Sequence, residues 1–426
     1  MTNLSNLADR SARSILRSGM AGVLIAGAAT SASAQDGPLK VGLLLPFTGQ
    51  YAWVGENVQP VAQMIAEEVN GAGGIAGRDI TFVQGDTEGV VDAGTTAAQK
   101  LINVDNVLAL VGPTSLSFSG SRNLIIDNHV PMVTPTAGTT ALDRACKDVC
   151  FRTVPSDSLG GRAIARAATD ADFLGDGAAW AKPVLMVAQS PAMVSFEEPI
   201  KRAFSEYGVD LAGVVEFTPG KPSYRSEVQE AMSANPDGIV LVAAPEDSAR
   251  VMTGAFQMGY EGGWFMTQDQ TTADYIELAG ADLVEGAYGL EEVASDESAA
   301  LNRAFEERYK AYSGDEVKIF GTNTYDSMNV IALAMYRDNM DDGKITRESL
   351  AAQIRAVSDP GDGKTVVTSY TEGKEALDAG EEIDYRGLVG PIDFDEWGNI
   401  AAPFGIRQVQ DGAWATVATI PASALN

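Results

Sequence analysis

The sequence predicts an α/β protein with two doubly wound parallel sheets. The first observation is an alternation of short apolar runs, typical of buried strands, with longer segments whose apolar residues recur at helical spacing. This alternation indicates βαβ units, in which a helix carries the chain to the next parallel strand. The second observation is the number of such units, which is too large for one sheet. The third is that no Pro- or Ser-rich linker separates two independent halves, so we expect the chain to cross between the two lobes more than once.

The expected strands are short runs of Val, Ile, Leu and other apolar residues. In chain order they are 40–45, 80–83, 107–111, 131–134, 184–188, 214–217, 239–243 and 264–267. The expected helices each have one apolar face, and they are 56–70, 95–103, 196–207, 247–258, 297–311 and 322–338. The polar, Gly-rich stretch 361–387 departs from this pattern, and we interpret it as an excursion before a terminal hairpin.

The first 34 residues are typical of a secretory signal peptide. A stretch with three arginines precedes the apolar run 19–30 and the small-residue cleavage signal Ala32-Ser33-Ala34. The alternative, a membrane anchor, needs about 20 apolar residues, and this run is shorter. We therefore expect a periplasmic protein released after residue 34. No cysteine follows the cleavage signal, so no lipid anchor is expected.

Composition excludes several classes of function. The chain has 58 Asp and Glu against 30 Lys and Arg, a formal net charge of −28. A surface this acidic repels phosphate backbones, so we expect no nucleic-acid partner. The single histidine, His129, excludes a multi-histidine zinc site, and we expect no metal and no cofactor. The two cysteines, Cys146 and Cys150, are predicted to form a local disulfide in an oxidising compartment. A redox-active pair, which usually has two intervening residues, is the alternative.

Three short motifs resemble known binding loops but stand in the wrong context. The Gly-rich run 71–77 follows an expected helix and precedes a strand, so we interpret it as a helix end and turn rather than a dinucleotide loop. Gly363-Lys364-Thr365 lacks the first glycine of a phosphate loop. The acidic turn 393–398 lacks the later carboxylate of a calcium loop, which leaves a β-hairpin turn as its interpretation. No Gly-x-Ser-x-Gly elbow occurs, and nothing in the sequence indicates catalysis.

Polar residues follow three of the expected strands, where ligands bind in such sheets. Residues 112–117 (Gly-Pro-Thr-Ser-Leu-Ser) open a helix, and free N–H groups and hydroxyls there suit an anion, although ordinary N-capping has the same appearance. Residues 134–139 add hydroxyls after the next strand. Asp269 follows the strand 264–267, and its carboxylate suits an ammonium group.

A series of loose motifs runs through the chain in order. They are 41–49 (VGLLLPFTG), 67–70 (EEVN), 73–75 (GGI), 77–78 (GR), 111–113 (VGP), 130–135 (VPMVTP), 151–157 (FRTVPSD) and 390–395 (GPIDFD). Together they resemble the periplasmic leucine/isoleucine/valine-binding protein family, the type I solute receptors of ABC importers. The resemblance extends over almost all of residues 38–420.

This resemblance implies two α/β lobes joined by a three-strand hinge. Lobe 1 is expected at 38–154 plus 293–402, and lobe 2 at 155–292 plus 403–426. A small-molecule ligand is expected between the lobes, which close around it by hinge bending.

The resemblance also implies where a ligand's carboxylate binds. In the amino-acid-binding members a serine and a helix start after the third strand hold the α-carboxylate. The spacing here points to Ser115, Leu116 or Ser117, and the family serine falls near Leu116. Thr136 and Gly138 occupy further carboxylate-contacting positions.

Four more residues are implied for the rest of the site. The acid that holds the ammonium group falls on Asp269, and an aromatic that flanks the ligand falls on Trp53. Met193 stands where a tyrosine usually covers the ligand, and this departure weakens a branched-chain assignment. Tyr325 either faces the cleft or packs in the core.

The function implied is that of an ABC-importer receptor for a small amino acid of the aliphatic or branched-chain class. Its partner would be a membrane permease, and we expect a monomer. The alternative keeps the fold but takes an amide, urea or an aromatic carboxylate, or serves a sensor in place of an importer. An exported enzyme is disfavoured because the chain has one histidine and no nucleophile motif.

Overall fold

The first sheet contains five parallel strands in the order β2-β1-β3-β4-β5. The computed structural model describes residues 37–170 and 179–425, so the expected signal peptide lies outside the described residues. The strands are β1 (Leu39–Leu45), β2 (Ile80–Asp86), β3 (Ala109–Val111), β4 (Met132–Thr134) and β5 (Cys150–Arg152). The interior strand β1 places Leu39 opposite Ile80 of β2 and Val41 opposite Ala109 of β3. Its side chains are almost all buried, as a strand covered on both faces requires.

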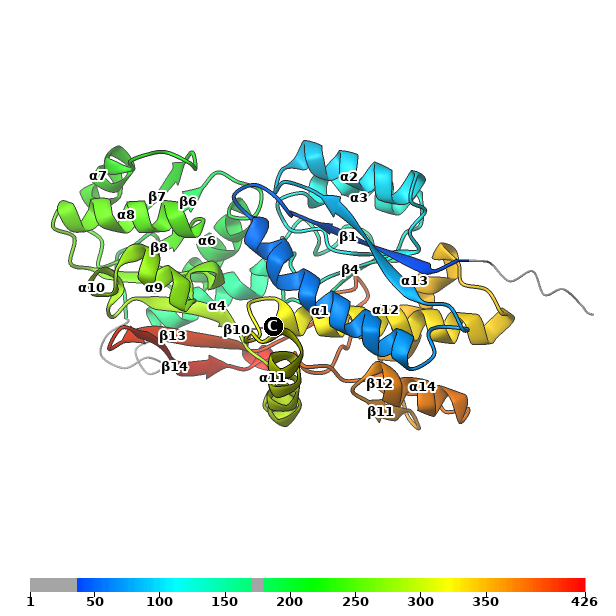
Figure 1. The fold of residues 1–426 in the computed structure, drawn as a ribbon. Helices are drawn as coiled ribbons and strands as arrows, with labels where there is room; N and C mark the ends of the chain where they lie inside the picture. Colours follow the sequence, from blue (N-terminus) through cyan, green and yellow to red (C-terminus); the bar gives the residue numbers. More distant parts are fainter. Residues whose placement is uncertain (1–36, 171–178, 426) are drawn as a thin grey trace, which may run out of the picture. The chain divides into compact units, whose positions relative to one another are not determined.

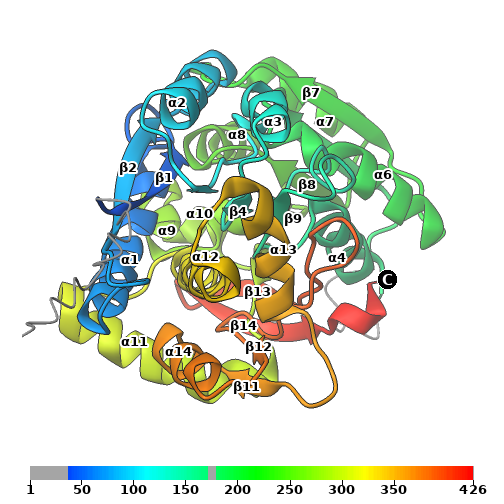
Figure 2. The same ribbon diagram turned by 90° about the vertical axis from the view of Figure 1, so that its right-hand side faces the viewer.

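Helices pack around this sheet and around one another. They are α1 (Ala52–Gly71), α2 (Val91–Asn103), α3 (Phe118–Asp127), α11 (Ala299–Ser313), α12 (Gly321–Asp342) and α13 (Arg347–Ser358). Helix α12 contacts α1, α13 and strand β4, and Figure 2 shows it near the middle of this group. Most of its residues are buried, which explains why its sequence lacks a distinct polar face.

The second sheet contains seven strands in the order β14-β13-β10-β9-β8-β6-β7. The parallel part is β6 (Pro183–Ala188), β7 (Gly213–Phe217), β8 (Gly238–Val242), β9 (Gly263–Met266) and β10 (Tyr288–Glu292). The hairpin of β13 (Phe404–Gln410) and β14 (Ala413–Ile420) adds two antiparallel strands at the edge, shown in red in Figure 1. The helices of this part are α4 (Asp157–Thr169), α6 (Glu197–Glu206), α7 (Arg225–Ser233), α8 (Pro245–Gln257), α9 (Ala273–Ala279) and α10 (Ala281–Val284).

Two separate hydrophobic cores accompany the two sheets. The chain leaves the first core, returns to it and leaves it again, so it crosses between them three times. The crossings lie between Val154 and Ala163, between Leu290 and Phe305, and between Ile400 and Phe404. Below, the parts built on the first and second cores are called lobe 1 and lobe 2. The predicted fold of two doubly wound sheets joined by three connections is confirmed, with the antiparallel hairpin as an addition to the second sheet.

The Gly-rich stretch 361–387 is more regular than an excursion suggests. It forms a small parallel pair, β11 (Thr365–Val367) with β12 (Ile383–Tyr385), connected by α14 (Tyr370–Asp378). The buried carboxylate of Asp326 accepts hydrogen bonds from the N–H groups of Leu388 and Val389. These buried hydrogen bonds hold the segment that follows β12 against α12.

Two turn interpretations have different outcomes. The run 71–77 ends α1 and turns toward β2, as predicted, and a Cβ at Gly74 would lie 2.3 Å from the Arg78 carbonyl oxygen. The interpretation of 393–398 as a β-hairpin turn is wrong. Its Asp395 carboxylate accepts from the N–H groups of Trp397 and Asn399, so it is a turn, but the strands before and after it belong to different sheets.

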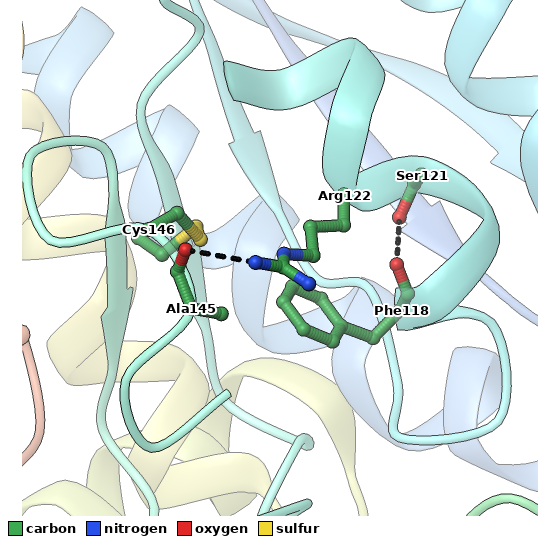
Figure 3. Close-up of a disulfide and its surroundings, with 6 residues drawn as sticks. Phe118, Ser121, Arg122, Ala145 and Cys146 are labelled. Carbon is green, nitrogen blue, oxygen red and sulfur yellow. Dashed lines mark hydrogen bonds between the residues drawn. A yellow bond between two sulfur atoms is a disulfide. The ribbon is translucent and has the colours of Figure 1, made fainter. Parts of the chain in front are cut away.

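The predicted disulfide joins Cys146 and Cys150 at the start of β5. In Figure 3 the Arg122 side chain of α3 extends toward this bridge, and its Nη2 donates to the Ala145 carbonyl oxygen at 3.2 Å. The bridge therefore fixes the segment between β4 and β5 where α3 contacts it. No helix in the described ranges is both long enough and apolar enough to span a membrane.

Candidate functional site

A cavity lies between the two lobes at the carboxyl ends of their parallel strands. It holds about 580 Å³ of space not filled by atoms, part of it open to solvent. Lobe 1 contributes Tyr51, Trp53, Val54, Thr114, Ser115, Leu116, Thr136, Gly138 and Phe320 to its wall. Asp157, at the first crossing, and lobe 2 contribute the rest, which are Ala192, Met193, Phe196, Thr267, Gln268 and Asp269.

The segment between β3 and α3 forms one end of this cavity. Within the described residues, no acceptor is found for the backbone N–H groups of Ser115 and Leu116. Both precede the first turn of α3, where N–H groups and the helix dipole together attract anions. The Thr139 N–H donates to Ser115 Oγ at 3.2 Å and so ties this segment to the loop after β4.

The loop after β4 passes directly over the carboxylate of Asp157. The Asp157 N–H donates to the Gly138 carbonyl oxygen at 2.8 Å. A Cβ at Gly138 would lie 2.1 Å from Asp157 Oδ1, so any larger residue would displace the carboxylate. Gly138 is therefore needed for the loop to pack closely on Asp157. Thr136, in the same loop, is buried and lines the cavity.

Ser195 joins the two lobes beside this carboxylate. Its Oγ donates to Asp157 Oδ2 at 2.5 Å and accepts from the Thr140 N–H at 2.9 Å. Thr140 belongs to the loop after β4 in lobe 1, while Ser195 lies in the short helix η2 (Val194–Phe196) of lobe 2. The pair of hydrogen bonds is thus a direct link across the cavity wall.

The nearest cation to these groups is already engaged. The Arg152 guanidinium is buried, and it donates to the Gly138 and Thr139 carbonyl oxygens and to Asp143 at 2.5 Å. It holds the loop after β4 in place without lining the cavity. No Lys, Arg or His is present in the described lining.

Lobe 2 places Asp269 on the opposite wall. Asp269 lies in the turn η3 (Gln268–Gln270) that follows β9. The turn is fixed because Thr267 Oγ1 donates to Gln270, whose side-chain amide in turn donates to the Ala243 carbonyl oxygen. No hydrogen bond or ion pair to the Asp269 carboxylate is found among the described residues, so it is free to accept from a ligand.

Aromatic and thioether groups complete the wall. The Trp53 ring stacks on Phe320 with centroids 6.1 Å apart and planes 11° from parallel. Phe320 holds a left-handed backbone conformation, φ 69°, immediately before α12, which is unusual for a bulky residue. Met193 is buried on the lobe 2 side. These groups suit the apolar portion of a ligand.

The electrostatics of the site are dominated by carboxylates. Burial raises the pKa of Asp157 to about 7, against the opposing effects of the Ser195 hydrogen bond and the Arg152 charge. Burial raises the pKa of Asp269 to about 6. Glu292, at the end of β10, has its pKa raised to about 8 by burial and by the neighbouring carboxylates of Asp157 and Asp269. Burial and Asp269 also raise the pKa of the Tyr51 phenol.

The cavity therefore favours a positively charged group near Asp157 and Asp269. A cation there would allow both carboxylates to ionise and would replace the water they lose on burial. Within the described residues, no group of three or more His, Cys, Asp and Glu side chains is placed to hold a metal ion.

Seven of the nine predicted ligand residues line this cavity, and two do not. The seven are Trp53, Ser115, Leu116, Thr136, Gly138, Met193 and Asp269. Ser117 is fully buried and packs against α2, where a Cβ at Gly94 would lie 2.6 Å from Ser117 Cβ. Tyr325 is buried beside Phe305, with ring centroids 4.8 Å apart, so it belongs to the core of lobe 1.

The prediction missed several residues of the wall. Thr114 follows the expected strand 107–111, and Asp157 ends the motif 151–157, so both stood in segments that the sequence analysis had already selected. Tyr51 was two residues from the aromatic that was chosen. Nothing in the sequence indicated that Phe320 lines the cavity, because it precedes a long helix and does not follow a strand.

Most of the described chain matches a known family. A profile of the periplasmic binding protein family matches residues 38–413. The chain belongs to the periplasmic binding protein family. This family consists of receptors that bind small-molecule solutes.

Three similar proteins illustrate the range within this family. The chain is 23% identical over 389 residues to the chemotactic signal transduction system substrate-binding protein BasB of Halobacterium salinarum, covering 89% of each protein. The leucine binding protein LivK of Thermotoga maritima shares the fold with a TM-score of 0.74 and 24% identity, over 90% of this chain and 99% of that one. A solute binding protein from R. palustris in complex with benzoate has a TM-score of 0.72 and 20% identity, over 90% and 97% of the two chains. The binding-protein fold is thus shared by receptors for chemically different ligands.

Proposed function

We propose that this chain is the periplasmic receptor of an ABC importer for a small amino acid. The observation that carries the proposal is the polarity of the interlobe cavity. In the described part of the chain, one end of the cavity has N–H groups without acceptors just before α3, and the other wall has the carboxylate of Asp269 without a donor. A zwitterion places its carboxylate at the first and its ammonium group at the second. Each charge-assisted hydrogen bond would contribute about 1.5–3 kcal/mol.

In this proposal the two lobes are the units that move. The ligand enters the open cleft, and the lobes rotate about the three crossings until both walls contact it. The Ser195 bridge to Thr140 then forms between the lobes. Closure buries the apolar part of the ligand against Trp53, Phe320 and Met193, which suits an aliphatic side chain.

The carboxylates argue against the aromatic-acid alternative. A benzoate-like ligand has no cation, so Asp157 and Asp269 would face it as like charges or as protonated acids. A neutral amide or urea would leave Asp269 without a counter-charge in a partly desolvated site. An amino acid avoids both costs. Whether the loaded form serves a permease or, as in the similar chemotaxis protein, a sensor does not change the ligand that this cavity favours.

The test is thermal unfolding of residues 35–426 against twenty amino acids, urea, short amides and benzoate. A ligand at 100 times its Kd stabilises the folded state by about 2.7 kcal/mol, which raises the Tm of a chain this size by a few degrees. A shift with a class of amino acids supports the proposal. Shifts with benzoate or amides and with no amino acid would overturn the ligand while leaving the fold unchanged.

A further inference from the structure

The last four residues of the segment between β3 and α3, 114–117, differ in the surroundings of their side chains. The family resemblance places the carboxylate-holding hydroxyl near Leu116, which has none. Ser117 is buried away from the cavity. Ser115 lines the cavity, and its Oγ accepts the Thr139 N–H while its own proton stays available to donate. Of the two hydroxyls of this segment that line the cavity, Thr114 Oγ1 is the one without any hydrogen-bond partner among the described residues.

Thr114 has the features expected of a ligand-contacting donor. Its side chain lines the cavity and is only 4% exposed. Its Oγ1 is buried and has no hydrogen-bond partner among the described residues. Buried hydroxyls are nearly always paired, because leaving one without a partner costs free energy. Thr114 keeps this hydroxyl unpaired beside the unpaired N–H groups of Ser115 and Leu116.

We propose that Thr114 Oγ1 is the side-chain donor to the carboxylate of the bound ligand, acting together with the N–H groups of Ser115 and Leu116. This inference rests on the proposed function and assigns its anion-binding hydroxyl. The donor stands two residues closer to β3 than the family pattern places it. Leu116, at the family position, then becomes an apolar contact. The ligand's carboxylate is thus held from the side of the strand end, on the wall that faces Asp269.

The test compares Thr114→Val with the wild type using L-leucine, L-alanine and the carboxamides of both as probes. Valine has the shape of threonine and lacks only the hydroxyl. The hydrogen bond to a charged group predicts about 10- to 150-fold weaker binding of the amino acid by the variant. The carboxamide lacks the charge, so its affinity should change much less. Thr114→Ser, which restores a hydroxyl, should recover most of the amino-acid affinity.

The matched control is Ser117→Ala. Ser117 Oγ is also buried and has no partner among the described residues, but it lies outside the cavity, so amino-acid affinity should stay at the wild-type value. If Thr114→Val does not fold, as judged by circular dichroism, Thr114→Ala removes the same hydroxyl without adding bulk.

The outcomes separate the inference from the proposed function. Unchanged amino-acid binding by the Thr114 variant, or equal losses for acid and carboxamide, would overturn the role of Thr114 while leaving the amino-acid receptor intact. A wild-type protein that binds neither amino acid nor any other carboxylate-bearing amine in the panel would overturn the proposed function, and the inference with it.

Discussion

Replacing Asp269 with Asn tests the central charge of the site, and it should change binding and stability in opposite directions. Asp269 lies in the η3 turn, lines the cavity and has no partner among the described residues. The substitution keeps the size of the side chain and removes its charge. An ammonium group bound there would lose its counter-ion. Breaking such a pair costs about 2–5 kcal/mol, which weakens binding about 30- to 5,000-fold.

Without ligand the same substitution should stabilise the protein. Burial raises the pKa of Asp269 from 3.8 to about 6, so the folded state binds this proton more tightly than the unfolded state. The stabilisation from that proton is complete below about pH 4 and is lost as pH rises through 6. At pH 7 the ionised, desolvated carboxylate therefore lowers the free energy of unfolding. Because the side chain is partly solvated, the gain from Asn is about 1–2 kcal/mol rather than the roughly 3 kcal/mol of the full shift.

Isothermal titration calorimetry with the amino acid found by the ligand panel, and thermal unfolding without ligand, measure the two effects. Asp274→Asn is the control, because this carboxylate is exposed on the nearby helix α9. It should leave the Kd unchanged. Equal affinity of wild type and Asp269→Asn would refute the ammonium role. A lower Tm of the unliganded variant would refute the claim that the buried carboxylate is held at a cost.

Three further predictions follow from the site and its supports. Amino-acid affinity should be constant above about pH 8, fall by up to about tenfold per pH unit between 7 and 6, and fall by up to about a hundredfold per unit well below 6, because the ammonium group needs the ionised forms of both Asp157 and Asp269, whose pKa values are about 7 and 6. Titrations between pH 5 and 9 check this, and a flat profile contradicts it. Ser195→Ala should weaken binding about tenfold, mainly through faster dissociation. The reason is that the Thr140 N–H loses its acceptor and the Asp157 carboxylate loses its donor between the lobes. A dissociation rate that matches the wild type in stopped-flow measurements would exclude a role in closure. Cys146→Ser should lower the free energy of unfolding by about 2 kcal/mol, because the disulfide closes a short loop. Ligand affinity should stay unchanged, because this loop lies outside the cavity. Denaturant titration measures the free energy of unfolding, and an unchanged midpoint would contradict the prediction.

The strand ends were the part of the site that local sequence could indicate. Asp269, Ser115 and Thr136 were chosen because polar residues directly follow apolar runs, and all three line the cavity. Ser117 shared that pattern, but helical geometry turns it toward α2. Tyr325 is in α12, where nearly every position is buried, so its polarity carried no information about the cleft.

The alternation of apolar runs and amphipathic segments determined the α/β class, because strand and helix periods are properties of neighbouring residues. It also determined most element positions and the local disulfide. Tertiary structure alone decided which distant groups meet. Phe320 and Trp53 are far apart in the chain but stack, and Asp157, Asp269 and Glu292 gather from three separate segments. The unpaired state of Thr114 is likewise visible only when every neighbouring donor and acceptor has been placed. Burial, charge and hydrogen-bond satisfaction depend on all surrounding atoms, and no local sequence pattern contains that information.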